Sequence, residues 1–176
     1  MIVLHIISKP DTLDFKPTYE DLPGIKKIEQ GELEKTLREN PGETIMFLGH
    51  GDGKGGLYTQ DLKEYVIDEN IIPLLKNRPV IGLWCYAAEF ADKNGLHGFF
   101  TSMFISEPRE YNMEFTGRGE KSEKELRDMN LKFSQRINKL LEDGVELEMW
   151  PGELQSYILP GSDEVERFNY ETFCYL

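Results

Sequence analysis

Cysteine is scarce in this chain, with 2 among 176 residues. Small secreted proteins that are held together by disulfides carry a much denser set of spaced cysteines, so the composition argues against that class. We expect Cys85 and Cys174 to remain thiols in a reducing compartment. A cytoplasmic location is the prediction that follows.

Basic residues and long apolar runs are also few. Lysine and arginine number 20 against 32 aspartates and glutamates, for a formal net charge of −12. Nucleic acids and anionic membranes attract basic surfaces, so we expect no nucleic acid and no membrane as a partner. The apolar run at residues 2–7 is too short for the core of a signal peptide or a membrane span, and no other segment approaches eighteen apolar residues.

Hydrophobic residues are nevertheless present in the amount that a folded protein needs. They make up 39% of the chain, and aromatic residues make up 11%, which is too much for a disordered acidic chain. The length is typical of one domain with its own core. We therefore predict a single domain over residues 1–176.

The order of apolar patterns predicts the fold class. Compact apolar runs without alternation are typical of strands buried on both faces, and they occupy residues 2–7, 44–48, 79–84 and 99–106, with shorter strand candidates at 145–149 and 157–159. Helical spacing with start or stop signals marks residues 32–40, 70–77, 87–94 and 122–143, and residues 11–24 are expected to be loop. Strands that alternate with helices predict an α/β fold, a three-layer sandwich with a mostly parallel sheet.

Two reactive side chains follow neighbouring predicted strands. His50 comes after the strand at 44–48, and Cys85 comes after the strand at 79–84. Parallel sheets bind ligands beyond the carboxyl ends of their strands, so we expect both side chains in one cleft. A thiol beside an imidazole is a nucleophile beside its base. Gly51 leaves room for a substrate carbonyl, and its N–H together with that of Cys85 is expected to form an oxyanion hole.

This arrangement resembles a known group of enzymes. The sequence Gly49-His50-Gly51 at the end of one apolar strand, with Cys85 at the end of another, resembles the caspase and hemoglobinase-fold cysteine peptidases, which include caspases, clostripain, gingipain and legumain. The resemblance covers residues 1–106. It implies a caspase-like fold, a peptide or protein substrate, and no metal or organic cofactor. By position it implies His50 as the base, Cys85 as the nucleophile and Gly51 as an oxyanion donor.

The resemblance also bears on specificity. Many relatives carry a polar or acidic residue two places before the cysteine, where it helps to bind the residue that precedes the cut, whereas this chain has Leu83. With a net charge of −12, we expect a substrate with Lys, Arg or a neutral residue there, and not Asp. The candidates to bind a cationic group are Asp52, Glu89 and Asp92. Each has a plainer interpretation, as a turn residue for the first and as solvated helix residues for the other two.

The glycine-rich stretch at residues 49–56 also suggests phosphate binding, but its spacing fits neither common motif. A phosphate loop with its lysine at position 54 requires Gly at 48 and Ser or Thr at 55, and the chain has Leu48 and Gly55. The dinucleotide-binding pattern fails as well, because Lys54 stands where its third glycine is required. Asp52 near His50 lacks a second close pair of ligands, so no metal site is expected.

Two functions remain open at this point. The first is a cysteine hydrolase, an endopeptidase that works through Cys85 and His50. The second is a catalytically silent caspase-like module that binds protein or peptide partners in the same cleft. The reactivity of the Cys85 thiol separates the two, because a nucleophile poised beside its base reacts selectively and a buried structural thiol does not.

Overall fold

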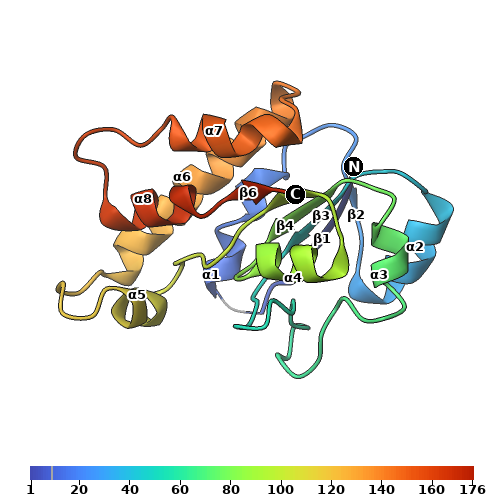
Figure 1. Cartoon of the computed structure of the whole chain (residues 1–176), viewed down its shortest axis with the longest axis horizontal. Coiled ribbons are helices and arrows are strands. Elements are labelled where there is room, and N and C mark those ends of the chain that lie inside the picture. Colours follow the sequence, from blue (N-terminus) through green and yellow to red (C-terminus); the bar gives the residue numbers. More distant parts are fainter. Residues whose placement is uncertain (9) are drawn as a thin grey trace.

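A computed structural model describes residues 1–8 and 10–176. Within these residues the strands form one six-stranded sheet in the order β2-β1-β3-β4-β5-β6 (Figure 1). The strands are β1 (Ile2–His5), β2 (Lys26–Lys27), β3 (Ile45–Leu48), β4 (Val80–Leu83), β5 (Gly98–Phe100) and β6 (Cys174–Tyr175). The first five are parallel, and β6 runs antiparallel to β5. The predicted α/β class with a mostly parallel sheet is confirmed.

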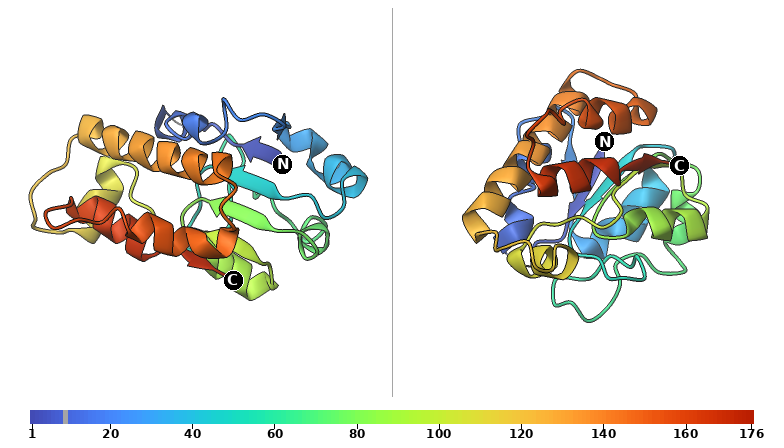
Figure 2. Two further views of the ribbon diagram at one scale, coloured as in Figure 1. Left: turned by 90° about the horizontal axis from the view of Figure 1, so that it is seen from above. Right: turned by 60° about the vertical axis from the view of Figure 1, so that its left-hand side comes forward.

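Helices cover both faces of this sheet (Figure 2). One face is covered by α2 (Leu33–Glu39), α3 (Ile72–Leu75) and α4 (Ala87–Asn94). The other face is covered by α6 (Glu123–Glu142), α7 (Trp150–Gln155) and α8 (Glu164–Glu171), with α1 (Pro10–Leu13) on the same side. Helix α5 (Pro108–Glu114) packs against α6 and α8. In the described part of the chain, none of the helices has the length and apolar character needed to cross a bilayer.

The central strands are apolar on both sides because both sides are covered. In β3, Ile45 and Phe47 pack into the core beneath α2 and α4, whereas Met46 and Leu48 pack into the core beneath α6. All four residues are completely buried. This explains why the strand shows no alternation of polar and apolar residues, as the sequence indicated.

Most of the predicted elements are present, but the last third of the chain departs from the prediction. The strand candidates at 145–149 and 157–159 are wrong: they belong to a 3-10 turn (Leu147–Met149) and to the turn that ends α7. The physical reason is Trp150, which is fully buried against the ring of Phe99 and starts a helix there. The outer strand pair of the sheet is completed instead by the two residues of β6.

Two further stretches were also interpreted incorrectly. Residues 11–24 are not all loop, because α1 and a 3-10 turn (Lys16–Thr18) lie there. Pro17 is compatible with that turn because the first helical turn needs no N–H donor from it. The expected strand at 99–106 ends at Phe100. Beyond it the chain leaves the sheet and passes across the carboxyl ends of the strands, which places it at the candidate site.

Candidate active site

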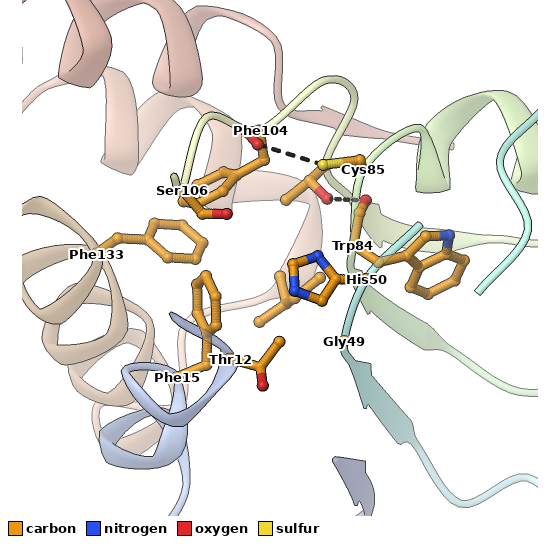
Figure 3. A pocket seen from close by; sticks show the side chains of 11 residues that line it. Thr12, Phe15, Gly49, His50, Trp84, Cys85, Phe104, Ser106 and Phe133 are labelled. Atoms are coloured by element: carbon orange, nitrogen blue, oxygen red, sulfur yellow. Dashed lines mark hydrogen bonds between the residues drawn. The ribbon is translucent and has the colours of Figure 1, made fainter. Parts of the chain in front are cut away.

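The register of the sheet brings His50 and Cys85 to corresponding positions. Leu48 of β3 pairs with Leu83 of β4, and the N–H of Gly49 donates to the carbonyl of Leu83 at 3.3 Å. His50 and Cys85 each come two residues later, so they emerge from adjacent strands at the same edge. Both line one pocket, together with Thr12, Phe15, Phe104, Ser106 and Phe133 among others (Figure 3).

The loop after His50 is a tight antiparallel turn that lies against the backbone of Cys85. Its flanking bonds run from Tyr58 N–H to the His50 carbonyl at 2.9 Å and from Asp52 N–H to the Gly56 carbonyl at 3.2 Å. A Cβ atom on Gly51 would stand 2.1 Å from the carbonyl oxygen of Cys85, so only glycine allows this approach. The two strand ends are therefore in direct backbone contact.

The neighbouring aromatic side chain holds the same loop from the opposite face of the sheet. Trp84 is buried on the side of α4, and its indole Nε1–H donates to the carbonyl of Gly55 at 2.9 Å. Tyr86, which follows Cys85 and precedes α4, has a φ of 64°, a left-handed conformation that is uncommon outside glycine. Cys85 therefore stands at a sharp turn between a strand and a helix, with its backbone fixed on both sides.

The thiol of Cys85 is enclosed. The residue is 8% exposed, and its Sγ donates to the main-chain carbonyl of Phe104 at 3.2 Å (Figure 3). The pocket that it shares with His50 has a volume of about 10 Å³, which is close to the space that one water molecule needs.

Glu110 is a partly buried carboxylate beside the thiol, and it was not among the site residues expected from the sequence. Its Oε1 lies 3.8 Å from Sγ of Cys85, and its Oε2 accepts from the N–H and the hydroxyl of Ser106, at 2.7 and 3.0 Å. It also accepts from the N–H of Glu107 at 3.1 Å, in a capping box at the start of α5. Burial raises the pKa of Glu110 above its ordinary value, against the opposing effect of these hydrogen bonds. The signal in the sequence was Pro108 at the start of a helix with a glutamate two residues later.

The three acidic candidates for substrate binding do not line the pocket. Asp52 is a turn residue: its Oδ1 accepts from the N–H groups of Lys54 and Gly56, and its Oδ2 accepts from the hydroxyl of Tyr65 at 2.6 Å. Burial favours a higher pKa for Asp52, but these bonds outweigh it and lower the pKa. The plainer interpretation of Asp52 fits these contacts.

The other two candidates lie on the exposed side of α4. Glu89 accepts a hydrogen bond from the hydroxyl of Ser102 at 2.6 Å, and Asp92 is exposed. Their charges, after the larger effect of burial, raise the pKa of Cys174. Neither carboxylate contacts Cys85 directly in the bonds that the described residues show. Across residues 1–8 and 10–176, no cluster of three or more histidine, cysteine or acidic residues is arranged to hold a metal ion.

Comparisons of the chain with protein-family models, with curated proteins and with solved structures found no match. The function therefore has to be inferred from the geometry of the site.

Proposed function

We propose that the protein is a cysteine hydrolase of caspase-like type, an endopeptidase in which Cys85 is the nucleophile and His50 the base. The observation that carries the proposal is the matched position of the two residues, each two places beyond the paired Leu48 and Leu83, with both side chains lining one pocket. A nucleophile and a base on adjacent strand ends are the minimum set for thiol catalysis.

The reaction would proceed in two steps, acylation of Cys85 and hydrolysis of the acyl thioester. His50 takes the proton of the Cys85 thiol as Sγ attacks the carbonyl carbon of the peptide bond, and the N–H groups of Gly51 and Cys85 bind the oxyanion. His50 then gives this proton to the leaving amine, the C–N bond breaks, and an acyl thioester remains on Cys85. A water molecule, deprotonated by His50, attacks the thioester and releases the acid, which restores the thiol.

A catalytically silent module that binds a protein or peptide partner is the second candidate. The observation that favours it is the enclosure of Cys85, which is 8% exposed and hydrogen-bonded to the carbonyl of Phe104. Buried cysteines of this kind are commonly inert. The two candidates differ in what happens when a peptide reaches the site: the hydrolase cleaves it and the silent module retains it.

The test is cleavage of a mixed peptide library, read by mass spectrometry. Cys174→Ser is the matched control, since it removes the second thiol of the chain, which is not among the residues that line the pocket. Wild type and Cys174→Ser should cleave alike, whereas Cys85→Ala and His50→Ala should each lose at least about a thousandfold in rate. Cleaved peptides should carry Lys, Arg or a neutral residue before the cut. Cleavage that survives in Cys85→Ala, or peptide binding without any cleavage, would contradict the hydrolase.

A further inference from the structure

The segment between β5 and α5 passes over the thiol of Cys85. We call residues 104–107 the strap; they are Phe104, Ile105, Ser106 and Glu107. The Phe104 carbonyl oxygen is 3.2 Å from Sγ, so strap main chain occupies the space beside the sulfur that a scissile carbonyl has to reach. An extended substrate and the strap therefore cannot occupy the site together.

Side chains from distant helices hold the strap in this place. Asn169 of α8 makes two bonds to Ile105: it accepts from the N–H at 2.8 Å and donates to the carbonyl at 3.1 Å. Asn130 of α6 donates to the carbonyl of Ser106 at 3.1 Å. Both asparagines are almost fully buried, at 3% and 1% exposure. These amides replace the sheet partners that the strap lost when it left β5.

The first residue of the strap is anchored by its ring. The Phe104 ring packs against Phe15 and Phe133, with ring centroids 5.6 and 4.9 Å apart, and it stacks on Phe173 at 6.1 Å. Phe15 and Phe133 also line the pocket of Cys85 and His50 (Figure 3). The ring therefore seals one side of the pocket while its own carbonyl covers the thiol.

The carboxylate of Glu110 contacts both the strap and the thiol. One carboxylate oxygen holds Ser106 and Glu107 through three bonds, and the other lies 3.8 Å from Sγ of Cys85. Hydrogen bonds to an ionised group are about twice as strong as neutral ones. This carboxylate therefore holds Ser106 and Glu107, at the end of the strap that adjoins α5. An ionised carboxylate at this distance also opposes negative charge on the sulfur.

We propose that the strap is a built-in pseudosubstrate that keeps Cys85 closed, and that Glu110 is the latch that holds it there. The proposal rests on the proposed function in so far as Cys85 is taken as the nucleophile. A substrate or an activating event has to displace the Phe104 carbonyl before the thiol can attack.

The test measures the rate at which iodoacetamide alkylates Cys85, with Cys174 as the internal reference in the same digest. Glu110→Gln keeps the shape of the side chain and removes its charge, and Glu114→Gln makes the same change on an exposed residue one turn further along α5. We expect Cys85 to react about tenfold faster in Glu110→Gln than in wild type, and faster still in Glu110→Ala. In Glu114→Gln the alkylation rate of Cys85 should equal that of wild type. The alkylation rate of Cys174 should be the same in all variants.

The proposal is wrong if Cys85 of Glu110→Gln reacts within twofold of wild type while the variant keeps its near-ultraviolet circular dichroism. It is also wrong if wild-type Cys85 already reacts as fast as a small free thiol.

A library assay on the same variants separates this outcome from the fate of the hydrolase. If Glu110→Gln exposes Cys85 but no variant cleaves any peptide, the strap is supported and the hydrolase fails. If wild type cleaves and Glu110→Gln neither reacts nor cleaves faster, the hydrolase stands and the strap fails. If cleavage rises in Glu110→Gln and is lost in the double variant with His50→Ala, both proposals are supported.

Discussion

Two segments meet at Cys85, and they are built in opposite ways. The loop at residues 50–56 approaches the cysteine closely because Gly51 has no side chain, so its backbone lies directly against the Cys85 carbonyl. Hydrogen bonds from Lys54 and Gly56 to the Asp52 side chain close the turn of this loop. The strap reaches the same cysteine by being held, through Asn169, Asn130 and Glu110. The loop is shaped by hydrogen bonds among its own residues and by close contact with residues 84–85. The strap is held by side chains of α6 and α8, which are far from it in sequence, and by Glu110 of the adjoining α5. The contrast predicts that steric changes break the loop and that polar changes release the strap.

The largest effect is expected at Gly51. An alanine there would put its Cβ 2.1 Å from the Cys85 carbonyl oxygen and 2.5 Å from the Trp84 ring, so the loop and the strand end have to separate. Gly51→Ala should lower the free energy of unfolding by about 3 kcal/mol. Urea unfolding measures this. Gly53→Ala is the control, since a Cβ at Gly53 has nothing within 4 Å, and equal losses in the two variants would contradict the close approach.

A somewhat smaller effect is expected at Asn169. Asn169→Ala leaves the N–H and the carbonyl of Ile105 without their amide partner inside the core, where Ile105 is 0% exposed. The free energy of unfolding should fall by about 2 to 3 kcal/mol, and Cys85 should become more accessible to iodoacetamide. Asn112→Ala on the exposed side of α5 should change neither quantity. A variant that loses stability while Cys85 stays protected would show that Asn169 serves the core and not the strap.

The third prediction concerns His5, a partly buried histidine at the end of β1 and outside both segments, which serves as a reference for the comparison. Burial lowers the pKa of His5 from 6.5 to about 4; the charges of Lys16 and Lys27 act in the same direction, and a hydrogen bond with Thr12 opposes them. Between pH 6.5 and 4 His5 is therefore protonated in the unfolded chain and neutral in the folded chain. The free energy of unfolding falls as the pH is lowered through this range.

The loss from His5 should amount to about 2 kcal/mol by pH 5. His5→Phe removes the titratable ring. Its free energy of unfolding should therefore depend less on pH between 6.5 and 4.5 than that of wild type. Parallel curves for the two proteins would contradict the burial of a neutral His5.

The sheet and the pair at its edge could be predicted because their signals are local. Apolar runs predicted β1, β3 and β4, and parallel strands bring their carboxyl ends to one edge, so His50 and Cys85 followed from counting along the chain. The prediction failed at 145–149 and 157–159, where apolar residues pack as helix and turn around the buried Trp150. Short apolar stretches do not distinguish these cases, because the choice depends on what packs against them.

The order of residues along the chain was enough to establish an α/β sheet, with a thiol and an imidazole on neighbouring strand ends. These features depend on strand periodicity and on chain direction, which are properties of short segments. The room that the sequence assigned at Gly51 to a substrate carbonyl is taken by the carbonyl of Cys85, a contact that only the tertiary structure shows. The state of the thiol was decided by tertiary contacts. Cys85 is closed because Asn130, Asn169 and Glu110 converge on residues 104–107, and such convergence of buried polar groups from separate helices exists only once the core has packed.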